Sequence, residues 1–315
     1  MNYVYGPVPS RRLGFSLGVD IVPFKICTYD CIYCQLGKTT LKTVERKAHV
    51  SSQDVLGELT SFLSEFNGQI DYIAFSGSGE PTLNNEISKM IREVKNLTPI
   101  PVAVLTNGSL FFHKDVREDL MGADVVLPSL DAVTPSVFEA INGPHSSLKI
   151  EAIIEGLSSF AKKFKGEVWL EVLLYRGIND DEGELEKIRE AIEIIKPNRI
   201  QLNTVTRPPG GREVYPLNRE ELKVARKIIG GRCEIIADFK DISWHRAVPE
   251  RLSTKDVGEK KVLDVLKRRP CTIEDISKSL GINRLELIKH IEALNKKGKL
   301  KSITKGEKIY YYSKG

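Results

Sequence analysis

Short apolar runs alternate with longer amphipathic segments through most of the chain. Runs rich in β-branched residues predict buried strands at 17–22, 72–75, 102–105, 125–127, 168–174 and 199–202. Apolar residues that recur every three or four positions predict helices at 51–63, 86–94, 114–121, 150–164, 181–195 and 218–229, and a short strand is expected near 234–237. Repeated βα units with right-handed crossovers imply an α/β fold with a parallel sheet, either an open barrel or a doubly wound sheet. No strand is predicted in the opening segment 5–16, which is rich in turn-forming residues.

The pattern changes after a linker near 249–253. Amphipathic segments predict helices at 255–267, 272–280 and 283–297, and two alternating runs around a Lys-Gly-Glu turn predict a hairpin at 299–312. Thr272 and Asp275 have the spacing of a capping box, and Gly281 marks a tight turn between two helices, as in a helix-turn-helix. With the hairpin as a wing, we expect a winged helix domain at 251–315 beside a core domain at 1–250.

The composition is typical of a globular protein, since 41% of the 315 residues are hydrophobic and 28% are charged. No apolar run reaches the ~20 residues that span a bilayer, and the N-terminus lacks the apolar core of a signal peptide. We therefore expect a cytoplasmic protein without a membrane partner.

Positive charge is concentrated at the C-terminal end. Residues 258–315 carry 15 Lys and Arg against 7 Asp and Glu, net +8, whereas residues 1–257 carry 32 against 35, net −3. This asymmetry indicates either a basic module that meets an acidic partner or a solvated lysine-rich face. Glu286 and Glu292 interrupt the basic surface of the last helix, so nucleic acid and protein both remain possible partners of this module.

Three of the five cysteines lie within eight residues, as Cys27, Cys31 and Cys34 in the spacing C-x₃-C-x₂-C. Closely spaced thiolates of this kind hold iron-sulfur clusters. The remaining cysteines lie far away in sequence, so a four-iron cluster here would keep one iron open for a small molecule, by the logic of catalytic metal sites. Two alternatives stay open: a structural zinc site with His49 as fourth ligand, and buried cysteines without a metal.

The cysteine spacing, with the aromatic Tyr33 just before the last cysteine, resembles the signature of the radical SAM superfamily. The resemblance implies a partial (β/α)₆ barrel, a [4Fe-4S] cluster on the three cysteines, and S-adenosylmethionine (SAM) chelated to the open iron. It further implies that one-electron reduction cleaves SAM to methionine and a 5′-deoxyadenosyl radical, with a flavodoxin-like or ferredoxin-like electron donor.

The same resemblance assigns residues at the strand ends to SAM. The turn Ser76-Gly77-Ser78-Gly79-Glu80-Pro81 occupies the place of the family's G-G-E-P-like motif, which binds the amino group of SAM. Thr106-Asn107-Gly108 and Ser129-Leu130-Asp131 follow the next two strands, where the family places contacts to ribose and methionine. The expected cofactor-binding residues are therefore Tyr33, Gly77, Ser78, Gly79, Glu80, Asn107, Ser129 and Asp131. Each of these segments is also compatible with ordinary turn formation.

Several other polar residues are weaker candidates. Glu171 would be costly to bury alone, so it either faces solvent or serves the site. Arg11 and Arg12 could pair with an anionic group near the cysteine loop. The segment 206–212, which holds Pro-Pro and Gly-Gly between two arginines, is either a loop that binds the substrate or a cofactor carboxylate, or a rigid connector.

The motifs before and after the cysteines resemble uncharacterised iron-sulfur oxidoreductases related to the wyosine-forming tRNA enzymes. Those enzymes carry a second cluster on cysteines further towards the N-terminus, and no cysteine precedes Cys27 here. We therefore expect a radical SAM enzyme of unidentified substrate, with RNA as one possibility. An activase that installs a radical on a partner protein, and a non-enzymatic redox regulator that binds DNA, are the alternatives.

Overall fold

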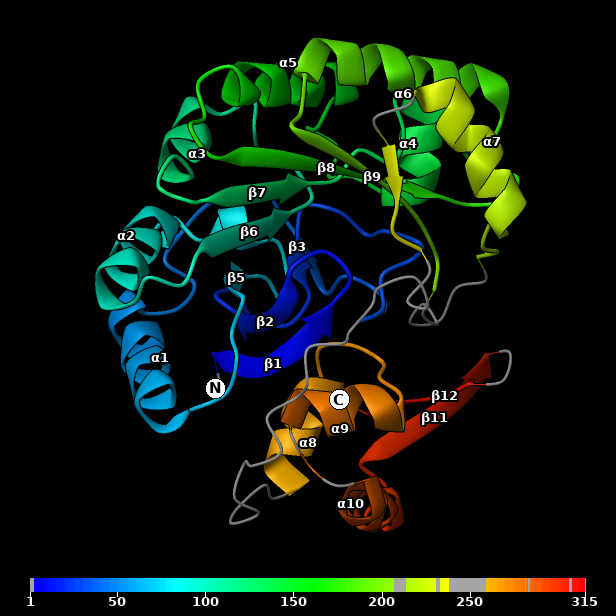
Figure 1. The fold of residues 1–315 in the computed structure, drawn as a ribbon. Coiled ribbons are helices and arrows are strands. Elements are labelled where there is room, and N and C mark those ends of the chain that lie inside the picture. Colours follow the sequence, from blue (N-terminus) through cyan, green and yellow to red (C-terminus); the bar gives the residue numbers. More distant parts are fainter. Residues whose placement is uncertain are drawn as a thin grey trace.

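A computed structural model describes residues 3–206, 214–230, 233–237, 259–280, 282, 284–305 and 308–314. The predicted linker at 249–253 and most of the candidate loop at 206–212 lie outside these ranges. Within them, the chain forms a large α/β unit and a small helical unit with a hairpin (Figure 1).

The large unit is built on one open sheet in the order β1-β2-β5-β6-β7-β8-β9-β10. All neighbouring strands from β2 onwards are parallel, and only β1 runs antiparallel, to β2. The strands are β1 (Val4–Ser10), β2 (Gly14–Val19), β5 (Tyr72–Phe75), β6 (Val102–Thr106), β7 (Val125–Pro128), β8 (Glu167–Leu174), β9 (Arg199–Thr204) and β10 (Cys233–Ile235). The predicted α/β fold with a parallel sheet is confirmed.

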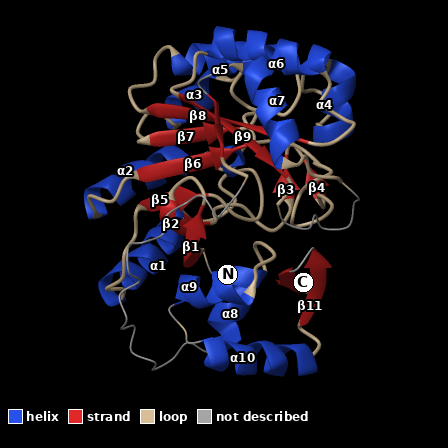
Figure 2. Cartoon of the chain, turned by 45° about the vertical axis from the view of Figure 1, so that its right-hand side comes forward, coloured by secondary structure: helices blue, strands red, loops and turns tan. Residues whose placement is uncertain are grey.

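Helices connect the strands and lie around the outside of the sheet (Figures 1 and 2). They are α1 (Ser52–Glu65), α2 (Ile87–Leu97), α3 (Lys114–Asp119), α4 (Pro135–Asn142), α5 (Ile150–Ala161), α6 (Glu182–Ile195) and α7 (Arg219–Ile229), and a 3₁₀ helix covers Pro81–Leu83. Side-chain caps fix several starts: Asp181 accepts from the Glu184 N–H, and Asn218 forms a full capping box with Glu221.

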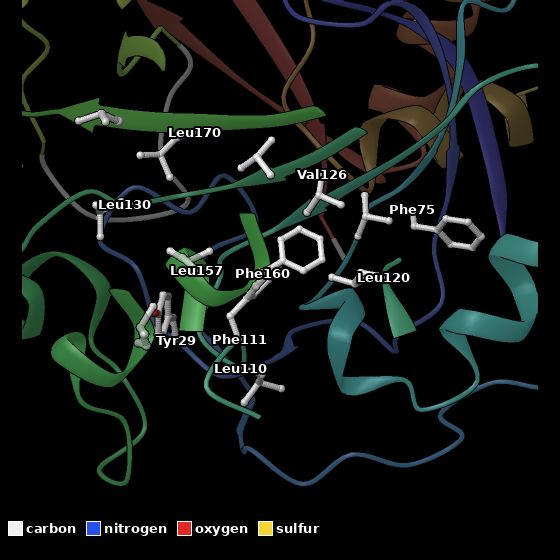
Figure 3. Close-up of a cluster of buried hydrophobic side chains, with 14 of the residues drawn as sticks. Tyr29, Phe75, Leu110, Phe111, Leu120, Val126, Leu130, Leu157, Phe160 and Leu170 are labelled. Carbon is white, nitrogen blue, oxygen red and sulfur yellow. The ribbon is translucent and has the colours of Figure 1, made fainter. Parts of the chain in front are cut away.

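The core fills the space between the sheet and these helices (Figure 3). Phe75 of β5 and Val126 of β7 are fully buried there, and Phe111 and Phe160 meet edge to face with ring centroids 5.0 Å apart. Because the sheet is covered on its helical side by apolar residues, the polar strand ends are the part of this unit left for chemistry.

Two of the elements that the sequence predictions missed are longer than three residues. The turn-rich opening segment forms β1, because Val4 and Val8 bury their side chains while the backbone pairs with β2. An unpredicted helix, α4, begins with Pro135 in its first turn and ends at Gly143, whose φ of 49° suits glycine. Both segments are short, and Gly and Pro within or beside them obscure their periodicity.

The small unit, here called the C-terminal module, contains α8 (Glu259–Leu266), α9 (Ile273–Leu280), α10 (Arg284–Lys296) and the hairpin of β11 (Leu300–Lys305) and β12 (Lys308–Ser313). Thr272 and Asp275 exchange the hydrogen bonds of a capping box, as predicted. The module has its own hydrophobic cluster, in which Val8 of β1 also takes part. The elements follow the predicted order, while the winged helix assignment and the domain boundary at 250/251 stay predictions.

The module packs against the edge of the large sheet. Helices α8 and α9 contact β1 (Figure 1). Across this contact, Ser279 Oγ donates to the Pro7 carbonyl at 2.7 Å. None of the described helices is long and apolar enough to cross a membrane.

Candidate functional site

The cysteine loop follows β2 and is anchored by two short paired strands, β3 (Ile26–Cys27) and β4 (Leu41–Lys42). Cys27, Cys31 and Cys34 are partly buried free thiols. Each sulfur has a nitrogen donor in reach. The donors are Asn107 Nδ2 on Cys27 Sγ at 3.5 Å, Asn142 Nδ2 on Cys31 Sγ at 3.6 Å, and Lys25 Nζ on Cys34 Sγ at 3.1 Å.

These donors matter because the surroundings oppose free thiolates. Burial, with the charge of Glu80, raises the pKa of Cys27 to about 12, and burial raises the pKa of Cys31 well above its usual value. Metal binding deprotonates such thiols, and hydrogen bonds to the sulfurs stabilise the negative charge that results. The three amide and ammonium donors therefore suit a site of metal-bound thiolates.

The turn after β5 is joined to the start of the cysteine loop. The Lys25 N–H donates to the Ser78 carbonyl at 2.7 Å, and the Glu80 N–H donates to the Ile26 carbonyl at 3.2 Å. A Cβ at Gly79 would lie 2.1 Å from the Ile26 carbonyl oxygen, so this close approach requires glycine. The turn and the cysteine loop thus form one structural unit.

Glu80 lies at the centre of this unit and is 2% exposed. Its Oε1 accepts from the N–H and Oγ1 of Thr82 at 3.1 and 2.6 Å and from Thr106 Oγ1 at 2.6 Å. Its Oε2 accepts from the Asn107 N–H at 2.7 Å. Burial raises the pKa of Glu80, and the donors oppose that rise. The carboxylate connects the ends of β5 and β6. Oε1 already accepts three hydrogen bonds, so a further donor would be accepted mainly by Oε2, which accepts one.

The remaining predicted residues lie at neighbouring strand ends. Asn107 follows β6, and its Nδ2 also donates to Thr28 Oγ1 at 2.7 Å. Ser129 follows β7 and bridges to Glu171 on β8. Asp131 is buried, and its carboxylate accepts from Tyr33 Oη at 2.6 Å, which fixes the aromatic residue of the cysteine motif. The structure therefore brings Tyr33 and Asp131 into direct contact.

Sequence reasoning did not single out several residues of this site. Lys25 and Asn142 reach the cysteine sulfurs, and neither belongs to a recognisable motif. Tyr175 is fully buried and stacks on Tyr33 with centroids 5.4 Å apart, while its hydroxyl has no hydrogen-bond partner among the described residues. A buried hydroxyl without a partner is unusual, so a water, an ion or a ligand is expected beside it.

Glu171 serves the interior and does not face bulk solvent. Arg12 Nη1 lies 2.6 Å from Glu171 Oε2, and Asn203 Nδ2 donates to Glu171 Oε1 at 2.8 Å. Arg11 Nη1 donates to Asn203 Oδ1 at 2.9 Å. Arg12 thus pairs with a carboxylate of β8, while the predicted pairing of an opening arginine with an anionic group near the cysteine loop stays a prediction. Cys233, by contrast, is packed in the hydrophobic core at 1% exposure.

The residues present fit a four-iron cluster with a small polar ligand beside it. The free thiols carry three nitrogen donors, the glycine turn allows close backbone approach, and Tyr175 offers an unpartnered hydroxyl. The cysteines would hold the cluster, and the turn with Asn107 and Asp131 would surround the ligand. When bound and reduced, such a cluster would supply one electron to the ligand beside it.

Comparison with known proteins places this site in a family. The model of the radical SAM superfamily matches residues 21–188, which is more than half of the chain. A protein of Brachyspira hyodysenteriae named GTPase Obg is 39% identical over 95% of this chain, although the chain spans only 43% of that protein's length. A UPF0026 protein of Methanocaldococcus jannaschii is 33% identical over 99% of this chain and 96% of its own length.

The fold agrees with these sequence relationships. The structure of TYW1 with a lysine-pyruvate adduct superimposes with a TM-score of 0.50 over 70% of this chain and 74% of that one, at 21% identity. The chain is a radical SAM enzyme, and its cofactors are a [4Fe-4S] cluster and SAM. Within this superfamily it belongs to the UPF0026 proteins.

Proposed function

We propose that the chain cleaves SAM reductively at Cys27, Cys31 and Cys34 and uses the resulting radical to modify RNA. The observation that carries the first part is the set of three thiols with three separate nitrogen donors beside the glycine turn. A flavodoxin-like or ferredoxin-like protein would supply the electron.

Each site residue has a distinct task in this proposal. Glu80, Asn107 and the backbone at Gly77–Gly79 hold the methionine end of SAM, because they lie next to Cys27 and are fixed to one another. Tyr33 and Asp131 form the opposite wall. Arg12 and Glu171 form a partly buried charge pair at 2.6 Å, which orients the substrate.

The case for RNA rests on the hairpin of the C-terminal module. Residues that face each other across the two strands have their side chains on the same side of the hairpin. One side carries three such pairs: Lys301 with Tyr312, Ile303 with Tyr310, and Lys305 with Lys308. Lys301 and Lys308 are exposed. On this side Tyr310 is buried, whereas Tyr312 is partly exposed. The two lysines can therefore contact phosphates and Tyr312 can stack on a base, a combination typical of single-stranded nucleic acid surfaces.

This side of the hairpin lies near the strand ends that carry the site. Lys305 Nζ donates to the Val205 carbonyl at 3.2 Å, and Tyr310 Oη donates to the Thr206 carbonyl at 3.2 Å. Val205 and Thr206 directly follow β9 (Arg199–Thr204), at the carboxyl end of the sheet. A strand of RNA bound along the hairpin would therefore pass the mouth of the site.

The test measures binding of bulk transfer RNA to the purified chain as a function of salt. K301E/K308E should weaken binding and lower the salt slope by about 2, since each lysine accounts for about one phosphate contact. K162E/K163E, at exposed positions after α5, makes the same charge change away from the hairpin and should leave binding near the wild-type level.

Equal effects of the two variants would contradict the RNA assignment. In that case, a protein that is retained by the wild type and lost in K301E/K308E, and that acquires a radical in the presence of SAM, would support the activase alternative. Binding of DNA without any SAM cleavage would support the redox regulator.

A further inference from the structure

Arg268 of the C-terminal module reaches into the large unit. It follows α8 (Glu259–Leu266), and its Nε lies 3.3 Å from Oδ2 of Asp20, the residue directly after β2. The side chains of Arg268 and Asp20 are only 8% and 3% exposed. The pair is thus a buried ion pair between two parts of the chain that are far apart in sequence.

Asp20 in turn shapes the turn after β5. Ser78 Oγ donates to Asp20 Oδ2 at 2.5 Å. Gly77 has a φ of 151°, and a Cβ at this position would lie 2.3 Å from Cγ of Asp20. The carboxylate therefore lies directly against the turn and leaves room only for glycine beside it.

A second route connects Arg268 with the same turn. Its guanidinium lies 4.4 Å from the ring centroid of Tyr5, and Tyr5 Oη is 2.9 Å from Ser76 Oγ. The Tyr5 ring covers Gly18, where any Cβ would lie 2.1 Å from Cζ of the ring. Arg268 thus holds two side chains, Asp20 and Tyr5, and each of them bonds to a serine of the turn.

From these two routes we infer that Arg268 is a positioning residue for the turn Ser76–Glu80, so that docking of the C-terminal module is required to order this part of the SAM site. The inference rests on the proposed role of the turn in holding SAM. It assigns the module a second task beside substrate binding, since its attachment to β1 would set how well the enzyme binds its cofactor.

Because the Arg268–Asp20 pair is buried, loss of Arg268 should change the structure of the turn Ser76–Glu80. A buried carboxylate that loses its cation is left with an uncompensated desolvation cost. Burial already raises the pKa of Asp20, and Ser78 and Arg268 both oppose that rise. Without Arg268, Asp20 takes up a proton or shifts towards water, and in either case its hydrogen bond with Ser78 changes.

The test compares R268Q with S279A in the full chain. Ser279 also crosses the interface, but it reaches the Pro7 carbonyl and not the turn. Two quantities are measured: hydrogen exchange of the peptide that contains Ser76–Glu80, and the affinity of the reconstituted protein for SAM. We expect R268Q to speed exchange of this peptide and raise the Kd for SAM about tenfold, or ~1.4 kcal/mol, whereas S279A should change neither by more than about twofold.

The double variant D20N/R268Q controls for misfolding of R268Q. It removes both charges together and so leaves no unpaired buried charge. It should keep the fold and still exchange faster at the turn. The inference would be overturned if R268Q kept the wild-type rate of hydrogen exchange at Ser76–Glu80 and the wild-type affinity for SAM. Full recovery of both quantities in D20N/R268Q would overturn it as well. Faster exchange with unchanged SAM affinity would overturn it too, and S78A, which alters the turn itself, would then show whether the proposed SAM site is also wrong.

Discussion

The backbone N–H of Asn107 donates to Oε2 of Glu80 at 2.7 Å and so ties the end of β6 to the turn after β5. The side chain of Asn107 continues from there to Cys27, with Nδ2 3.5 Å from Sγ. A single carboxylate therefore fixes the distance between the turn proposed to hold SAM and a cysteine proposed to hold the cluster.

Replacing this carboxylate should weaken SAM binding without unfolding the protein. In E80Q, one oxygen becomes an NH₂ group that faces donors, so at least one buried donor loses its partner at a cost of ~1–3 kcal/mol. We expect the Kd for SAM to rise about tenfold, measured by equilibrium dialysis on the reconstituted protein. E58Q is the matched control, since Glu58 accepts two backbone N–H groups, of Tyr3 and Val4, away from the cysteines. Equal affinity of E80Q and wild type would contradict this role.

Lys25 should tune the electron affinity of the cluster. It is 3% exposed, and its ammonium lies 3.1 Å from Cys34 Sγ. A cation beside a cluster sulfur favours the reduced form, so K25M should lower the reduction potential by tens of millivolts. Redox titration followed by electron paramagnetic resonance measures the shift. K25R keeps the charge and should stay closer to wild type, and an unchanged potential in K25M would refute the effect.

Tyr175 offers a test that separates function from stability. Its hydroxyl is buried without a hydrogen-bond partner in the described structure, so Y175F removes a group that stabilises nothing in the free protein. The melting temperature should be unchanged or slightly higher. SAM affinity or cleavage should nevertheless fall severalfold, because the hydroxyl would contact the bound cofactor or substrate. If Y175F bound and cleaved SAM as well as wild type, the Tyr175 hydroxyl would have no role in the site.

The sequence predicted most of the fold because its strands and helices have clear periodicity. The six main strands were all predicted, whereas β1 and α4 were missed because Gly and Pro interrupt short segments there. The cysteines were evident from their spacing. Lys25, Asn142 and Tyr175 were not, since each enters the site through tertiary packing. The link between Arg268 and Asp20 joins positions 248 residues apart, and no local pattern marks it.

Asp131 should make the stability of the cluster-free protein depend on pH. Burial raises its pKa from 3.8 to about 6, although hydrogen bonds from Tyr33 and Asn142 oppose the rise. The folded protein binds this proton more tightly than the unfolded chain between these two values, so the free energy of unfolding falls as pH rises through that window.

D131N lacks this titration and provides the reference. The free energy of unfolding is measured in urea under reducing conditions for wild type and D131N. The value for wild type minus that for D131N should be larger at pH ~4.5 than at pH ~7, by on the order of 2 kcal/mol. A difference that is constant with pH would mean that Asp131 is ionised throughout.

The most direct test of the central claim is formation of 5′-deoxyadenosine. The chain is reconstituted anaerobically with iron and sulfide, reduced, and given SAM, alongside C31A and the distant buried-cysteine control C233A. We predict product in wild type and C233A and none in C31A, because Cys31 is an expected cluster ligand and Cys233 lies in the core. Absence of product from wild type that holds an intact four-iron cluster would contradict the proposed reaction.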